Sequence, residues 1–103
     1  MTQKLKTYAW DITEHLRTEE EMAAYLSAIL DEGDPALFVS AVGDIAKARG
    51  LAEIAQKAGV SRTRLSRSFS ETGRPEFSTV INVIRSLGMR LTAEPQKLEL
   101  ANA

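Results

Sequence analysis

Arginine and hydroxyl side chains alternate between Ser61 and Arg67, directly after a glycine-containing turn. Helical spacing would bury Leu65 and Phe69 on one face of this stretch and leave the polar side chains on the other. Guanidinium and hydroxyl groups on an exposed helix face are donors of the kind that contact base edges and phosphates. The residue types and their spacing therefore predict a nucleic-acid interface.

Different members of this interface are expected to have different roles. Ser61, with its backbone N–H, is expected to bind a phosphate, and so is Arg64, which leans toward the flank of the helix. Arg74 and Lys57 are weaker candidates for phosphate contacts. The candidate base-contacting residues are Arg62, Thr63, Ser66 and Arg67. The competing explanation is a solvated, arginine-rich face without a ligand, which the turn spacing and the alternating hydroxyls disfavour.

Two short helices would position these side chains. The first is predicted over residues 51–58, where Ala55 is the small side chain that a close helix crossing needs. Gly59 can adopt the positive φ of the turn, Val60 supplies an apolar plug, and Ser61 is a suitable N-cap for the second helix. A small residue, a glycine four positions later and apolar residues beyond it form the helix-turn-helix pattern.

Three further helices are predicted from capping residues and apolar periodicity. A capping box opens one helix at Thr18, Asp34–Pro35 opens another that ends near Arg49, and the last spans about residues 76–87. Gly43 lies inside the second of these helices, where we expect close packing against a neighbour. The side chains expected to face the core are Met22, Tyr25, Leu26, Ile29, Leu30, Leu37, Phe38, Val42, Ile45, Phe77, Val80, Ile81, Ile84 and Leu87.

The apolar period changes from helical to alternating after Gly88. Met89, Leu91 and Ala93 alternate with polar residues, which predicts a short strand. A single strand needs a ladder partner, so we hypothesise that it pairs with its own copy or with the sheet edge of another protein. The expected fold is therefore an all-α, five-helix, phage-repressor-like helix-turn-helix domain with a short C-terminal β-strand.

The chain is expected to divide into three parts. Residues 1–33 form an N-terminal arm and helix that we assign to partner contact, residues 34–95 form the helix-turn-helix DNA-binding domain, and residues 96–103 form a tail. Two conformations stay open for the N-terminal arm, because its apolar residues fit both an alternating and a helical spacing. Its Trp10 is expected either to cover an edge of the core or to dock into a partner.

Composition and charge limit the class of protein. The chain has 103 residues, of which 44% are hydrophobic, and no cysteine, which fits one small domain without disulfides or thiolate metal sites. It contains neither an apolar run of transmembrane length nor the apolar segment of a signal peptide, so we expect a cytoplasmic protein with no membrane partner.

Charge is strongly polarised along the chain, although the net charge is only −1. Residues 1–46 carry three basic and nine acidic side chains, whereas residues 47–90 carry nine basic and three acidic ones. The predicted interface therefore lies in a basic half of the chain, as electrostatic binding to DNA requires. The acidic half would suit a basic protein partner.

The sequence offers no set of residues for catalysis. His15 is the only histidine, and neither metal-ligand spacing nor a glycine-rich nucleotide-binding loop is present. We therefore expect no enzyme activity, no cofactor and no bound metal.

Several segments between Trp10 and Glu94 resemble a known family. They are EGDPAL, DIAKARG, AGVSR, PEFSTV and LGMRL, and together they are similar to the addiction-module antidotes, the HigA-like antitoxins. The resemblance implies a toxin partner of the RelE/ParE-like superfamily of ribonucleases and gyrase poisons. It also implies a homodimer that represses its own operon by binding operator DNA.

Two functions compete on these grounds. The first is an antitoxin of a type II toxin–antitoxin module, for which Trp10 and Tyr25 are the candidate toxin contacts. The alternative is a stand-alone helix-turn-helix transcriptional repressor without a toxin partner.

Two positions depart from the family pattern: Glu53 lies near a position where relatives have a phosphate-binding glutamine, and Arg74 stands where asparagine is common.

Overall fold

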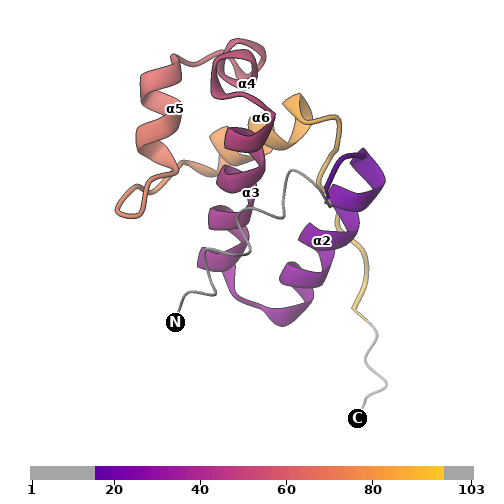
Figure 1. Cartoon of the computed structure of the whole chain (residues 1–103). Helices are drawn as coiled ribbons and strands as arrows, with labels where there is room; N and C mark the ends of the chain where they lie inside the picture. Colours follow the sequence, from indigo (N-terminus) through magenta and orange to yellow (C-terminus); the bar gives the residue numbers. More distant parts are fainter. Residues whose placement is uncertain (1–15, 97–103) are drawn as a thin grey trace, which may run out of the picture.

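The computed structural model describes residues 16–96, which form five helices joined by short connections (Figure 1). The helices are α2 (Glu19–Glu32), α3 (Pro35–Arg49), α4 (Leu51–Ala58), α5 (Arg62–Ser68) and α6 (Phe77–Ser86). The predicted all-helical architecture with five helices is confirmed. None of these described helices is long and apolar enough to cross a membrane.

The first two helices begin at the caps that the sequence predicts. Thr18 Oγ1 accepts the N–H of Glu21 at 3.1 Å, and Glu21 Oε1 accepts the N–H of Thr18 at 3.1 Å, which completes a capping box. Asp34 Oδ1 accepts the N–H of Leu37 at 3.1 Å, and Pro35 is the first residue of α3. These caps leave a tight turn between α2 and α3, which lie side by side as an antiparallel pair (Figure 1).

A shared hydrophobic core joins all five helices. Helix α3 packs against α2, α4 and α6, and α4 also packs against α5 and α6. Within residues 16–96 no polar or charged residue is buried, so apolar burial holds the helices together. The buried side chains are Met22, Leu26, Ile29, Phe38, Ala41, Val42, Ile45, Ala46, Ile54, Ala55, Leu65, Phe69, Val80, Val83, Ile84 and Leu87. The division of the chain after residues 33 and 95 stays a prediction.

Helix α4, a three-residue connection and α5 carry the predicted interface. Ala55 is buried, Gly59 has a φ of 79°, and Val60 packs partly buried against the core. Ser61 Oγ accepts the N–H of Arg64 at 3.0 Å and so caps α5. The secondary structure expected for this stretch is confirmed, whereas its assignment to the helix-turn-helix class stays a prediction.

Gly43 allows α3 to approach the end of α5 closely. A Cβ added at Gly43 would lie 2.9 Å from Phe69 Cβ and 3.0 Å from Phe69 Cδ1. Phe69 is the C-cap of α5 and is buried in the core. The close packing expected at this glycine is confirmed, and it anchors the C-terminal end of α5 on α3.

The prediction that every apolar residue of the helical stripes faces the core is wrong at four positions. Tyr25, Leu30, Leu37 and Phe77 have exposed fractions of 38%, 46%, 43% and 69%. On α2 the row of Met22, Leu26 and Ile29 fills the core, and the other two residues of the predicted stripe flank this row. Leu37 and Phe77 lie in the first turns of α3 and α6, before each helix reaches the core. Periodicity alone does not separate the edge of an apolar stripe from its centre.

The prediction of a C-terminal strand is wrong as well. Residues 89–96 have no regular secondary structure, and no strand lies anywhere in the described part of the chain. Met89 and Leu91 pack partly buried against the core, whereas the residues after them are exposed. A strand needs a ladder partner, and residues 16–96 offer none. Met89 and Leu91 instead hold the start of this segment against the core, while Ala93 is exposed.

Replacing Gly43 with Ala is expected to destabilise the fold. Alanine is favoured over glycine in a helix by about 1 kcal/mol, but the added methyl would overlap Phe69, and overpacking costs about 1–3 kcal/mol. We expect a net loss of about 1 kcal/mol in the free energy of unfolding, measured by urea denaturation. Ser40→Ala, at an exposed position of the same helix, is the control and should be neutral or slightly stabilising. A Gly43→Ala variant more stable than the wild type would contradict the close packing.

Candidate nucleic-acid interface

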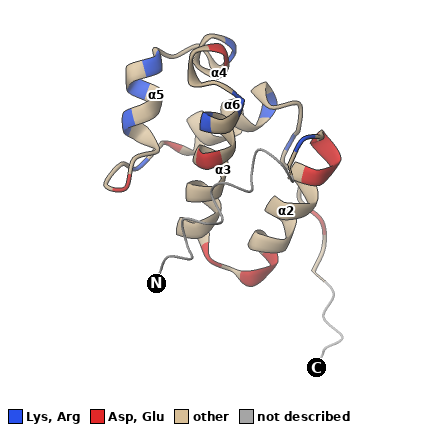
Figure 2. Ribbon diagram, viewed as in Figure 1, with Lys and Arg blue, Asp and Glu red and all other residues tan. Residues whose placement is uncertain are grey.

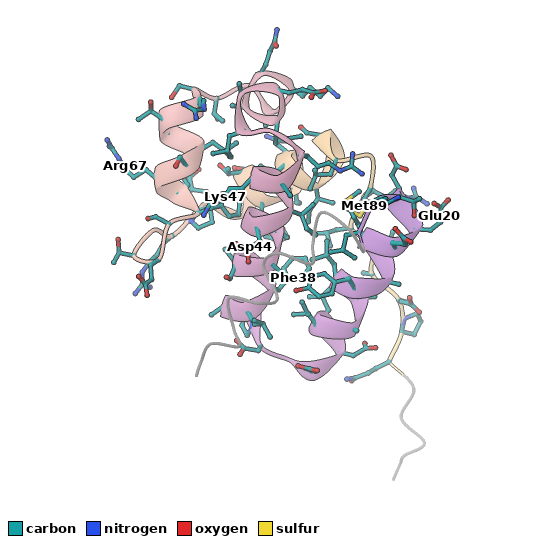
Figure 3. All side chains as sticks on the ribbon, in the orientation of Figure 1. Glu20, Phe38, Asp44, Lys47, Arg67 and Met89 are labelled. Carbon is teal, nitrogen blue, oxygen red and sulfur yellow. The ribbon has the colours of Figure 1, made fainter. Side chains whose placement is uncertain are left out.

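An open concavity of about 360 Å³ lies on the outer face of α5. It is lined by Arg62, Thr63, Ser66, Arg67 and Ser70. The structure therefore brings the four predicted base-contacting residues together on one surface. They face outward because Leu65 and Phe69 occupy the opposite, buried side of the helix, and Figure 3 shows the side chain of Arg67 pointing away from the bundle.

None of the predicted phosphate contacts lines this concavity. Ser61 accepts the N–H of Arg64 through Oγ, which leaves its hydroxyl proton available to a ligand. Arg64 and Arg74 are exposed. Lys57 lies on α4, where its Nζ is 3.2 Å from Glu53 Oε2 in an exposed ion pair. Glu53 therefore offsets part of the positive charge on α4.

A tight turn closes the C-terminal end of α5. Ser70 donates its N–H and its hydroxyl to the carbonyl oxygen of Arg67, at 3.2 and 2.8 Å. The N–H of Gly73 donates to the carbonyl oxygen of Ser70 at 2.9 Å. A Cβ added at Gly73 would overlap the carbonyl oxygens of Arg67 and Ser68. The turn therefore requires glycine at this position, and it holds Ser70 at the edge of the concavity.

Ser70 is the lining residue that the sequence interpretation missed. It lies beyond the last residue of α5, so a search limited to the helix does not include it. Its spacing of four residues from Ser66 continues the outward-facing row. Extending the helical period past the C-terminus would have identified it.

Among the described residues, the acidic and basic parts of the sequence also lie in different parts of the fold. Figure 2 shows basic residues along α5 and acidic residues at both ends of α2. The acidic residues at the start of α2 are Glu19, Glu20 and Glu21. The positive field is therefore concentrated at the surface that carries the candidate base contacts.

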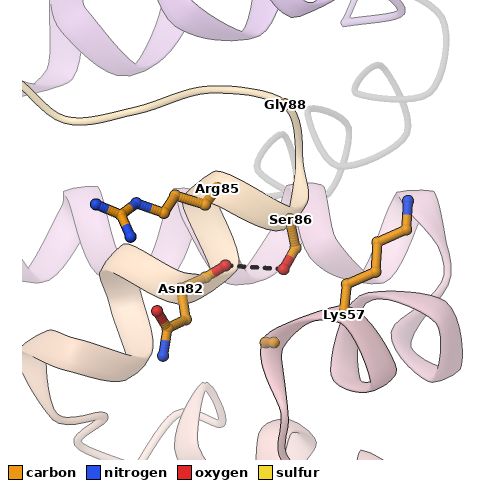
Figure 4. A pocket seen from close by; sticks show the side chains of 6 residues that line it. Lys57, Asn82, Arg85, Ser86 and Gly88 are labelled. Carbon is orange, nitrogen blue, oxygen red and sulfur yellow. Dashed lines mark hydrogen bonds between the residues drawn. The ribbon is translucent and has the colours of Figure 1, made fainter.

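A second concavity, of about 530 Å³, lies between the C-terminal ends of α4 and α6 (Figure 4). Lys57 and Arg85 line it, but Lys57 is paired with Glu53. The hydroxyl of Ser86 donates to the carbonyl oxygen of Asn82 at 2.8 Å. Both helices direct their carbonyl ends here, which disfavours an anion. This concavity is therefore a poorer candidate for a phosphate than the face of α5.

Asp44 has a perturbed carboxyl group on α3. Partial burial raises the pKa of Asp44 above its ordinary value of 3.8, and the positive charge of Lys47, one turn along the same helix, opposes this shift (Figure 3). At neutral pH the ionised carboxylate is therefore less favourable in the folded chain than in the unfolded chain.

The candidate toxin contacts stay a prediction. Tyr25 lies on α2 and is exposed, whereas Trp10 lies outside the described residues, as does the lone histidine, His15. Within residues 16–96, no group of three or more His, Cys, Asp or Glu side chains is placed to hold a metal ion.

Comparison with known proteins assigns the chain to a family. The family model described as "Probable addiction module antidote protein" matches residues 6–95, and the protein belongs to this family of addiction-module antidotes. It is 42% identical over 97 residues to an uncharacterized protein of Haemophilus influenzae, a span of 94% of this chain and 98% of the relative. No solved structure gives a significant match. An antidote family implies a toxin partner and indicates a regulatory protein.

Replacing Gly73 with Ala is expected to disrupt the turn after α5. The new methyl would meet backbone carbonyl oxygens that cannot move away independently, so we expect a loss of about 1–3 kcal/mol in the free energy of unfolding. Amide hydrogen exchange at Ser70 should also become faster, because its hydrogen bonds lie in this turn. Thr72→Ala, at an exposed neighbouring position, is the control. Unchanged exchange and stability would show that the turn does not depend on glycine.

Replacing Asp44 with Asn is expected to remove a pH-dependent cost. Because the pKa of Asp44 is raised in the folded wild type, its carboxyl group holds a proton more tightly there than in the unfolded chain. Ionisation of Asp44 therefore lowers the free energy of unfolding as the pH rises from 3.8 through the folded pKa. The stability of Asp44→Asn relative to wild type should therefore grow across this window and stay constant above it. Urea denaturation at a series of pH values measures the difference. A difference independent of pH would contradict the raised pKa.

Proposed function

We propose that this antidote is the antitoxin of a type II toxin–antitoxin module, which neutralises a RelE/ParE-like toxin and represses its own operon. The single observation that carries the DNA-binding part is the gathering of two arginines and three hydroxyl residues around the open concavity on the outer face of α5. Family membership supports the toxin-binding part, because an antidote acts on a toxin.

In this proposal α5 enters the major groove of operator DNA. Arg62 and Arg67 have the guanidinium groups that pair with guanine in a bidentate way, and Thr63 and Ser66 contribute smaller donors and acceptors. The phosphate contacts would come from Ser61, Arg64 and Arg74, and they would set the orientation of the helix in the groove.

The proposal includes a homodimer that acts in the cytoplasm, where the operon is transcribed. Helix α5 has only seven residues, so one copy contacts few base pairs. Two copies that bind half-sites about 34 Å apart would combine their contacts and gain specificity. A repressor without a toxin would use the same DNA surface, but it would not account for membership in an antidote family.

Replacing Arg67 with Ala tests the DNA-binding part. We expect a loss of about 1–3 kcal/mol in binding free energy on the operator upstream of the gene, and a relaxed base preference at one position. Fluorescence anisotropy titrations on this operator and on its single-base variants measure both effects. Wild-type binding should also weaken steeply as salt concentration rises.

Arg85→Ala is the matched control, because Arg85 lies on α6 and outside the α5 concavity. It should bind the operator as the wild type does. An Arg67→Ala variant that loses equal affinity for operator and random DNA would show that Arg67 contacts phosphate. Wild-type protein that binds neither DNA would overturn the repressor function.

A further inference from the structure

The turn between α2 and α3 forms an exposed corner with both apolar and acidic side chains. We call this surface the acidic corner, and its members are Leu30, Asp31, Glu32, Asp34 and Leu37. It projects at the end of the bundle opposite α4 (Figure 1). All five side chains lie within one turn of the connection between the two helices.

Two large apolar side chains remain exposed at the acidic corner. Leu30 is 46% exposed and Leu37 is 43% exposed. Leu30 also borders a small cleft of about 60 Å³ between α2, α3 and the segment that follows α6. Exposed apolar side chains that are rimmed by charged residues are typical of a surface that a partner covers.

The acidic side chains of this corner have no cationic partner within the described residues. The chain contains no Lys or Arg between Arg17 and Lys47, whereas it contains seven Asp or Glu residues there. Asp34 accepts the N–H of Leu37, but its negative charge stays unbalanced. Figure 2 shows acidic residues at this turn and no described basic residue within the turn itself. The cation nearest to it along the small cleft is Arg90, which lines that cleft together with Leu30. The corner therefore presents apolar groups inside a negative field.

We propose that the acidic corner is the docking surface for the toxin, through a concave toxin surface that combines apolar groups with a basic rim. This inference rests on the proposed function, because it needs a toxin partner, and it deepens that function by locating the contact. Opposite charges would steer the two proteins together, and the leucines would supply apolar burial on contact. Like charges disfavour the pairing of two corners from two copies of this chain.

The acidic corner and the α5 interface lie far enough apart to be occupied together. Helix α3 has 15 residues and so is about 22 Å long, and the corner lies at its N-terminal end. Helix α4 follows its C-terminal end and leads directly to α5 (Figure 1). A toxin docked at the corner therefore leaves the arginines of α5 free for DNA.

The test uses the full chain and the purified product of the small reading frame adjacent to its gene. In the Asp31→Lys/Glu32→Lys variant the corner becomes basic, while the capping Asp34 is kept. Both positions lie in the last turn of α2, where lysine suits the helix dipole, so the fold should be preserved.

The matched control is Glu53→Lys/Glu71→Lys, which makes the same change in net charge at exposed positions far from the corner. Leu37→Gln tests the apolar part.

We expect the corner reversal to weaken binding of this product by about tenfold or more, measured by isothermal titration calorimetry. Leu37→Gln should weaken it several-fold, and the control double variant should stay close to wild type. All corner variants should bind operator DNA as the wild type does.

The outcomes separate this inference from the proposed function. If the wild type does not bind the product, the antitoxin function is overturned, and the docking surface with it. If the wild type binds and the corner variants bind equally well, the docking surface is overturned while the antitoxin function stands. If the corner variants change only the oligomeric state in light scattering, a second copy of this chain covers the corner, and the proposal is wrong.

Discussion

The burial of Leu65 and Phe69 is the constraint on which the outer face of α5 depends. A helix of seven residues is too short to be stable alone, so packing against α4 and against Gly43 of α3 must order it. Once the inner side is buried, helical geometry determines which side chains face outward. The gathering of arginines and hydroxyls at one concavity is therefore a consequence of apolar packing on the other side of the helix.

The same bundle separates two surfaces of opposite charge. Helix α3 connects them, because its first turn forms part of the acidic corner and its C-terminal end leads to α4 and α5. No polar or charged side chain is buried among the described residues, so the core does not require either end of the bundle to have a particular charge. In an antitoxin that binds both a toxin and DNA, this arrangement would allow each partner its own end of the molecule.

Local signals in the sequence were sufficient to predict the helices and their caps. Thr18, Asp34 and Ser61 each cap a helix through a side-chain oxygen and a nearby N–H, and such contacts depend on a few neighbouring residues. The side of α5 that faces outward also followed from short-range periodicity. Long-range features were harder to predict: exposure at Leu37 and Phe77 depends on where each helix meets the core, and the expected strand required a partner that the described chain does not contain. Ser70 was missed because a turn, and not the helix, carries it to the concavity.

DNA binding through α5 is tested most directly by an NMR titration of the isotope-labelled chain with an operator duplex from the region upstream of its gene. We expect backbone amide shifts and line broadening to concentrate at residues 61–70, with additional changes near Arg74, while the amides of the acidic corner stay unchanged. Perturbations concentrated on α2, or on the concavity between α4 and α6 in place of α5, would contradict it.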